Sequence, residues 1–224
     1  MEKTGKIKRS TSPAGSPILF VPKPHGQGLR LYVDCQALNR VTIPNCYPLL
    51  LMQELQHRVR GAQWFLKMDL KNGFHLIHVW EGDKWKTAFP TRYGLFEFQV
   101  MLFELTNAPS TFQDMMNHIF SDMLVISVIA YMDDILVYAE TQERHNHLVK
   151  EVLKRLQMNG LAVSLEKCIW RTQEVEFLGY VIGRKGTIRM SEEKIDAVLS
   201  WKKPRSLTEV QSFLGSADFY RRFI

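Results

Sequence analysis

The segment Tyr131-Met132-Asp133-Asp134 constrains the fold of this chain most, because it places two adjacent carboxylates between two apolar runs. These runs cover residues 125–130 and 135–137. The pattern is typical of a β-hairpin with acidic residues at its tip. Successive strand side chains point to opposite faces, so a turn is the natural place to aim neighbouring carboxylates at one point in the solvent. Since hard cations prefer oxygen ligands, the sequence predicts a metal site at this tip.

A third carboxylate, Asp69, ends another short apolar run, which begins at Trp64. Alone, Asp69 would be interpreted as a solvated turn residue. If the three acids meet at one sheet edge, they can hold Mg²⁺, which accepts few protein carboxylates and leaves positions open for substrate phosphates. Two such ions can clamp the attacking and leaving oxygens of a phosphoryl transfer. Nucleotidyl transfer is therefore the leading chemistry.

Other short motifs occur in order around the two acidic segments. They are Ser12-Pro13-Ala14-Gly15-Ser16-Pro17, Leu29-Arg30-Leu31-Tyr32-Val33-Asp34, Lys84-Trp85-Lys86-Thr87-Ala88-Phe89, Leu105-Thr106-Asn107-Ala108-Pro109, Phe177-Leu178-Gly179-Tyr180 and Tyr220-Arg221-Arg222-Phe223. A Y-x-D-D segment alone would be a weak signal, whereas the ordered series is specific. On these motifs, almost all of the 224 residues resemble the reverse transcriptases of gypsy-like long-terminal-repeat retrotransposons.

The resemblance implies an RNA-directed DNA polymerase, a nucleotidyltransferase that adds dNTPs to a primer 3′-hydroxyl on an RNA or DNA template. By the resemblance, Asp69, Asp133 and Asp134 would hold two Mg²⁺ ions, with Mn²⁺ as an alternative, and Lys167 would donate a proton to the pyrophosphate. Three crowded carboxylates repel one another. Without metal, we therefore expect at least one of them to have a raised pKa.

The resemblance also assigns residues to substrate and primer. Lys23 and Arg30 would contact the triphosphate, and Phe74 would pack under the deoxyribose and exclude a 2′-hydroxyl, although a Phe on a strand is more often part of a core. The remaining expected nucleotide-binding residues are Phe103, Tyr131 and Met132. The expected primer grip, a hairpin that positions the primer end, consists of Phe177, Leu178, Gly179 and Tyr180.

The expected fold class is α+β: polymerase fingers and palm, with an antiparallel palm sheet packed on helices and only the start of a thumb. Apolar residues at helical spacing predict helices near residues 51–60, 109–123 and 148–160, and capping residues predict two more after Ser191 and Ser206. The expected domain boundaries are residues 1–62 for the first part of the fingers, 63–78 for the first palm segment, 79–108 for the second part of the fingers, 109–182 for the rest of the palm and 183–224 for the start of the thumb or connection.

Four departures from the family pattern leave alternatives open. Leu102 and Glu104 replace a proline and a glycine, Gln36 replaces an arginine, and Leu76 replaces a glutamine. A side chain at position 104 would strain the backbone if φ is positive there, and its charge would repel a triphosphate. The chain is thus an active polymerase domain, a decayed relic that still binds nucleic acid, or a non-enzymatic interaction protein on a palm fold.

Composition agrees with a nucleic-acid partner without specifying one. The formal net charge is +6, from 29 basic and 23 acidic residues. Cys35, Cys46 and Cys168 form no C-x-x-C pair and are expected to be buried reduced thiols. We expect an intracellular location, whether cytoplasmic, in a virus-like particle or nuclear, with no secretory signal and no membrane partner. The expected protein partner is the remainder of a pol polyprotein, namely the thumb, ribonuclease H and integrase.

Overall fold

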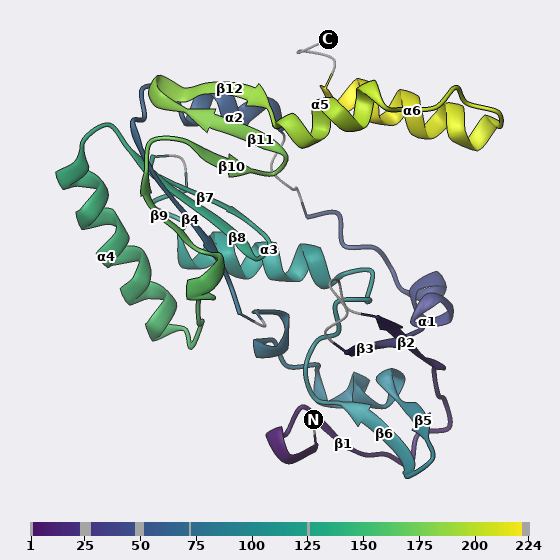
Figure 1. The fold of residues 1–224 in the computed structure, drawn as a ribbon. Helices are drawn as coiled ribbons and strands as arrows, with labels where there is room; N and C mark the ends of the chain where they lie inside the picture. Colours follow the sequence, from purple (N-terminus) through teal and green to yellow (C-terminus); the bar gives the residue numbers. More distant parts are fainter. Residues whose placement is uncertain (1, 23–27, 48–51, 72, 125, 221–224) are drawn as a thin grey trace.

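The computed structural model describes residues 2–22, 28–47, 52–71, 73–124 and 126–220 of the 224-residue chain (Figure 1). The side chains of Arg30, Met52, Gln53 and Phe219 also lie outside this description. The α-helices are α1 (Gln36–Val41), α2 (Met52–Arg58), α3 (Ala108–Ile119), α4 (Gln142–Met158), α5 (Glu192–Leu199) and α6 (Leu207–Tyr220). The strands are β1 (Ile7–Arg9), β2 (Ile18–Pro22), β3 (Leu29–Val33), β4 (Trp64–Asp69), β5 (Phe89–Thr91), β6 (Gly94–Phe98), β7 (Val128–Tyr131), β8 (Asp134–Ala139), β9 (Ile169–Thr172), β10 (Val175–Phe177), β11 (Tyr180–Gly183) and β12 (Thr187–Met190).

The antiparallel sheet that carries the acids has the strand order β7-β8-β4-β9. Strand alternation divides its side chains between two cores. Leu66 and Val137 face a core that includes side chains of α3 and α4, whereas Phe65 and Leu136 face a core that includes side chains of α2 and of the small sheet β10-β11-β12. The expected packing of helices on the sheet is confirmed, but both faces are covered, because the β10-β11-β12 sheet closes the second face (Figure 1).

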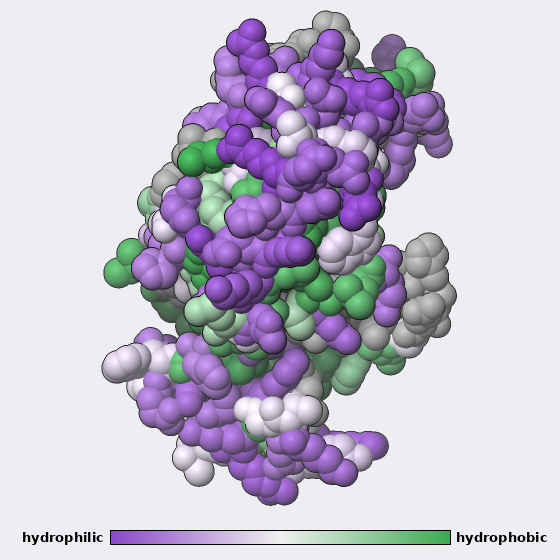
Figure 2. Space-filling view, turned by 90° about the vertical axis from the view of Figure 1, so that its left-hand side faces the viewer, coloured by the Kyte–Doolittle hydropathy of each residue, from purple (hydrophilic) through white to green (hydrophobic). Residues whose placement is uncertain are grey.

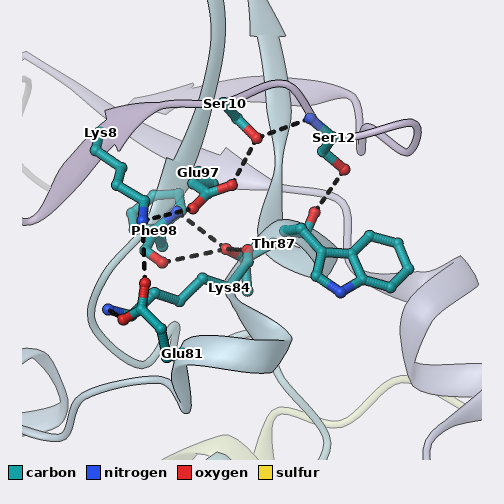
Figure 3. Close-up of polar contacts among 9 residues, drawn as sticks. Lys8, Ser10, Ser12, Glu81, Lys84, Thr87, Glu97 and Phe98 are labelled. Atoms are coloured by element: carbon teal, nitrogen blue, oxygen red, sulfur yellow. Dashed lines mark hydrogen bonds and ion pairs between the residues drawn. The ribbon is translucent and has the colours of Figure 1, made fainter.

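A smaller apolar core lies in the lower part of Figure 1, where the sheet β1-β6-β5 and the hairpin β2-β3 pack around Val33, Phe89 and Phe98. A buried carboxylate joins β1 to β6 in this region. Glu97 is 6 % exposed, its Oε2 accepts a hydrogen bond from Ser10 Oγ at 2.5 Å, and its Oε1 lies 3.3 Å from Lys8 Nζ (Figure 3). This network ties the N-terminal strand to the rest of the domain.

The predicted helices are present, but their caps differ in detail. Ser206 Oγ accepts from the backbone N–H of Glu209, as a cap should, while the Glu209 carboxylate accepts from the backbone of Arg205 instead of closing a capping box on Ser206. Asn107 precedes α3 but does not cap it, because its side chain bonds the backbone of Ile43 and Asn45. Ser191 makes no side-chain cap, and its hydroxyl is buried without a partner among the described residues.

The cysteines were only partly predicted. All three thiols are free, but Cys35 alone is buried; Cys46 is exposed and Cys168 is intermediate. Hydrophilic residues cover most of the side of the molecule on which α4 lies (Figure 2). Within the described residues, no helix is both long enough and apolar enough to cross a membrane.

Candidate active site

The acidic hairpin is present as predicted, with β7 and β8 paired from Val128–Val137 to Tyr131–Asp134. Met132 and Asp133 form the two-residue turn, and Met132 adopts a left-handed φ of 50°. The buried side chain of Gln113, on α3, holds this turn. Its Oε1 accepts from the Met132 backbone N–H at 3.0 Å, and its Nε2 donates to the Ala130 carbonyl at 2.9 Å. This role of Gln113 could not be predicted from the sequence, because it depends on how α3 packs against β7.

The pairing of β4 with β8 brings Asp69 directly opposite Asp134. Each of these carboxylates is paired with a lysine. Lys167 Nζ lies 3.2 and 3.3 Å from the two carboxylate oxygens of Asp69, and Lys67 Nζ lies 3.6 Å from Asp134 Oδ1. Lys67 was not predicted as a site residue, although it precedes Asp69 by two positions and therefore lies on the same face of β4.

Asp133 differs from the other two acids in that one of its oxygens, Oδ1, is buried without a hydrogen-bond partner among the described residues. A Cβ added to Gly73 would come within 3.0 Å of this oxygen. Burial raises the pKa of Asp133 to about 6, helped by the charges of Asp69 and Asp134 and opposed by Lys167. Burial also raises the pKa of Asp134, and Lys67 partly offsets this effect. The predicted rise in at least one carboxylate pKa is thus confirmed.

In their present positions, the described residues contain no group of three or more His, Cys, Asp or Glu side chains that could hold a metal ion. The donor set nevertheless suits a hard cation, since it consists of carboxylate oxygens. The buried Asp133 Oδ1 lacks a hydrogen-bond partner among the described residues, and a bound cation would satisfy it. Release of Asp69 from Lys167, and of Asp134 from Lys67, would make further oxygens available to a cation.

A cluster of aromatic rings adjoins this acidic edge. Phe74 is 6 % exposed and stacks on Phe112 with a centroid distance of 4.6 Å. The ring of Phe103, which is 59 % exposed, meets it edge to face at 5.1 Å. Phe74 lies in the 3-10 turn Gly73–Leu76 and not on a strand.

The structure corrects the expected backbone strain at Glu104. Among the described residues, the non-glycine residues with positive φ are Met132, Arg171, Leu178 and Lys185, so the Glu104 backbone is not left-handed. Its carbonyl accepts from Asn39 Nδ2 at 2.8 Å. Its charge acts on Cys35, whose pKa is raised to about 11 first by burial and then by Glu104.

The expected primer grip is a tight hairpin between β10 and β11. Leu178 and Gly179 form its turn with φ of 53° and 81°, the left-handed pair that two-residue hairpins favour. Phe177 and Tyr180 are buried. A Cβ on Gly179 would lie 2.8 Å from Tyr220 Oη, so glycine allows the hairpin to approach α6 closely.

Two predicted substrate residues cannot be placed. Lys23 lies outside the described residues, as does the side chain of Arg30. The backbone of Arg30 pairs with Val21 in the antiparallel pairing of β2 with β3.

Comparisons with known proteins agree with this geometry. A family model described as "Reverse transcriptase (RNA-dependent DNA polymerase)" matches residues 21–182. The Tf2-3 and Tf2-7 transposon polyproteins of Schizosaccharomyces pombe are 40 % and 39 % identical over 99 % of this chain, which spans only 16 % of their length.

Among solved structures, a foamy viral protease-reverse transcriptase in complex with double-stranded DNA matches with a TM-score of 0.88 and 27 % identity over 98 % of this chain and 38 % of its own. The same viral protein in complex with an RNA/DNA hybrid matches with a TM-score of 0.83 at 27 % identity, over 98 % of this chain and 29 % of its own. These structures confirm the α+β fold of polymerase fingers and palm. The chain therefore belongs to the reverse transcriptase (RNA-dependent DNA polymerase) family, and the predicted resemblance to retrotransposon reverse transcriptases is confirmed.

Proposed function

We propose that this chain supplies the catalytic edge of an RNA-directed DNA polymerase, with Asp69, Asp133 and Asp134 as the metal-binding carboxylates. The observation that supports this most is the juxtaposition of Asp69 with Asp134 across β4 and β8, next to the unpartnered Asp133 Oδ1. A structural ion-pair network would not leave a buried carboxylate oxygen without a partner.

Bound Mg²⁺, or Mn²⁺, would supply the Lewis acid that activates a primer 3′-hydroxyl and neutralises the leaving pyrophosphate. The chain's own residues provide the rest. The Gln113 side chain fixes the Met132–Asp133 turn, so that Asp133 keeps one orientation. Lys67 and Lys167 balance the carboxylate charge in the absence of metal. Lys167 lies beside Asp69 at this edge. A pyrophosphate group that bound next to Asp69 would therefore be within reach of a proton from Lys167.

The nucleotide would lie over the aromatic cluster, with Phe74 beneath the sugar and the exposed ring of Phe103 at its border. Tyr131 and Met132 would contact the nucleotide or the primer end from the hairpin itself. Lys23 and Arg30 would contact the triphosphate from the β2-β3 hairpin. The hairpin turn at Leu178 and Gly179 would position the primer.

The domain boundaries predicted from the sequence are proposed on the same basis. The core around Val33, Phe89 and Phe98 corresponds to the fingers, and the two cores on either face of the β7-β8-β4-β9 sheet correspond to the palm. A longer polyprotein, an RNA or DNA template with its primer, and dNTPs are the proposed partners. Three free thiols fit the proposed intracellular location, whether cytoplasmic, in a virus-like particle or nuclear.

The second candidate is a decayed copy that folds and binds nucleic acid without polymerising. The substitutions at Gln36 and Leu76 favour it, since both side chains are exposed where the family pattern carries polar contacts. Glu104 supports the decayed copy less than expected, because its backbone does not adopt a positive φ. No observation favours the interaction protein.

Primer extension with Mg²⁺ or Mn²⁺ on RNA and DNA templates tests the proposal, with Asp133→Asn as the inactive variant and Arg92→Gln as the matched surface control. We expect extension by the parent and the control, and none by Asp133→Asn. Extension by Asp133→Asn at the parent rate would contradict the metal assignment. A folded parent that binds duplex but never extends a primer would establish the decayed copy.

A further inference from the structure

A polar cavity lies at the far end of the palm sheet from the acids. It has a volume of about 180 Å³, and its charged lining consists of Arg58, Arg60, Arg144 and Glu140. Ala139, at the end of β8, also lines it and pairs with Trp64, whereas the acids pair at Asp69 and Asp134. Five residue steps along the strand separate the two ends, or about 17 Å. The cavity is therefore distinct from the proposed active site.

Close backbone packing fixes the walls of this cavity. Gln63 N–H donates to the Ala139 carbonyl at 2.9 Å, which joins the segment after α2 to the end of β8. A Cβ on Gly186 would lie 2.5 Å from the Val59 carbonyl oxygen and 2.8 Å from Arg60 Cα, so only glycine permits this approach. The backbone that carries Arg60 is thus held against a second segment of the chain.

The lining carries more positive than negative charge. Arg58 is partly neutralised, because its Nη2 lies 2.8 Å from Glu54, and its Nη1 donates to the Leu124 carbonyl at 3.3 Å. In the described part of the chain, neither Arg60 nor Arg144 forms an ion pair. Glu140 is the acid that faces them. Two arginines therefore face the cavity without a bonded counter-ion.

The position of Arg144 is unfavourable for a cation. It lies in the first turn of α4, after the Thr141 cap, where the helix dipole and the free backbone N–H groups favour negative charge. Glu143 lies in the same turn and Glu140 lines the cavity, but neither forms an ion pair with Arg144 in the described part of the chain. An anion between Arg60 and Arg144 would remove this electrostatic conflict.

We propose that this cavity binds a phosphate group, held by the guanidinium groups of Arg58, Arg60 and Arg144. The three lining cations are all arginines, whose planar fork can bond phosphate oxygens in pairs, which an ammonium group cannot do. The volume admits a phosphate or a pyrophosphate but is smaller than typical sites for whole organic ligands. This site goes beyond the proposed polymerase function and requires no metal ion.

Isothermal titration of the full chain with sodium pyrophosphate, in EDTA and at constant ionic strength, tests the proposal. The test variant is Arg60→Gln/Arg144→Gln, and the matched control is Arg92→Gln/Arg205→Gln, which removes the same charge from exposed positions elsewhere. We expect one pyrophosphate per chain for the parent and the control, and an affinity about tenfold weaker for the test variant. Equal affinity for all three proteins, or no binding to the parent, would overturn the proposal.

Two further variants test whether the pyrophosphate binds in this cavity. Asp133→Asn should bind pyrophosphate like the parent, because it alters only the acidic edge; a changed affinity in this variant, in either direction, would place the anion at the active site and overturn the proposal. If the double variant does not fold, Arg144→Gln alone, at an exposed helix position, tests the same contact.

Titration with 5′-phosphorylated and 5′-hydroxyl oligonucleotides then identifies the source of the phosphate. A 5′-phosphate preference that Arg60→Gln/Arg144→Gln abolishes supports a nucleic-acid end, and a pyrophosphate effect without such a preference supports a free anion.

Discussion

At the scale of single residues, the three acids occupy three different environments on one sheet edge. Asp69 has a lysine on both oxygens, Asp134 has a more distant lysine, and Asp133 has a buried oxygen with no partner in the described part of the chain. A metal-free edge of this kind is destabilised at Asp133, since its buried oxygen has no hydrogen-bond partner among the described residues and the charge of Lys167 only partly offsets the cost of burial. The most sensitive changes should therefore be at this residue.

The Asp133→Asn variant should be more stable than the parent at pH 7 in the absence of metal. Burial raises the pKa of Asp133 from its ordinary value of 3.8 to about 6 in the folded chain, so above pH 6 the folded state bears the cost of an ionised buried group. Between pH 6 and 3.8 the folded parent takes up a proton that the unfolded parent does not, so parental stability rises as the pH falls. After allowance for solvent screening, we expect an advantage of about 1 kcal/mol for the variant at pH 7, shrinking towards pH 4.

Urea denaturation in EDTA at several pH values measures this difference, and Glu104→Gln serves as a carboxylate control away from the sheet. Addition of Mg²⁺ should stabilise the parent more than Asp133→Asn, because binding to the folded state raises its stability. A variant that is less stable than the parent at pH 7 would show that Asp133 is already compensated.

Phe74→Val should lower the preference for dNTPs over rNTPs in any version of this chain that polymerises. A smaller side chain leaves room beneath the sugar for a 2′-hydroxyl. Because Phe74 is 6 % exposed and stacks on Phe112, the change should also destabilise the fold by about 2 to 4 kcal/mol. The ratio of kcat/KM for dNTP and rNTP separates these effects, since loss of folded enzyme reduces both values equally. An unchanged ratio would make Phe74 a core residue only.

At the scale of elements, the sequence predicted what local periodicity and caps determine. The i, i+3, i+7 pattern predicted α2, α3 and α4, and the apolar runs predicted β4, β7 and β8 with the acids at their ends. Features that arise from packing between distant segments were not predictable. The roles of Gln113 and Lys67 depend on how α3 and β8 lie beside them, and the 3-10 turn at Phe74 has no periodicity of its own.

Glu97→Gln should weaken the attachment of β1 to β6. The variant loses the charge that Lys8 faces and the strong acceptor of the Ser10 hydroxyl, so we expect a loss of about 1 to 2 kcal/mol in unfolding free energy (Figure 3). Ser10→Ala should cost a similar amount, whereas Lys8→Met, at a largely exposed lysine, should cost less and depend on salt. A double-mutant cycle for Ser10 and Glu97 measures their coupling. Additive single losses would mean that the buried network does not act as a unit.

In the segment of Leu102 and Glu104, the charge of Glu104 alone should affect the KM for dNTPs. Because Glu104 lacks a positive φ, Glu104→Gly should change the dNTP KM no more than Glu104→Gln does, and any gain from either should decline with ionic strength. Kinetics of the two variants in a protein that includes a complete thumb measure this. A clearly larger gain from Glu104→Gly would restore the case for backbone strain.

At the scale of the whole molecule, the acidic edge and the arginine-lined cavity lie at opposite ends of the palm sheet. The net charge is +6, yet Lys67 and Lys167 are occupied by the carboxylates of the acidic edge, so other cations must supply the attraction for a polyanion. The arginine-lined cavity at the other end of the sheet is one such place. On the two proposals, the fold would separate a metal-dependent site from a phosphate site that needs no metal.

Binding of this chain to RNA or DNA duplexes should weaken steeply as salt increases and should show little sequence preference. Displacement of counter-ions from phosphates causes this dependence, with a slope of about −0.9 per phosphate contact for B-form DNA. Fluorescence anisotropy across a salt series gives the number of contacts for the parent, for Arg60→Gln/Arg144→Gln and for Arg92→Gln/Arg205→Gln. If the cavity holds a backbone phosphate, only the first variant should reduce the slope. An unchanged slope for this variant would restrict the cavity to free phosphate or strand ends. Salt-insensitive binding by the parent would argue against a nucleic-acid enzyme and for a protein interaction module on the same fold.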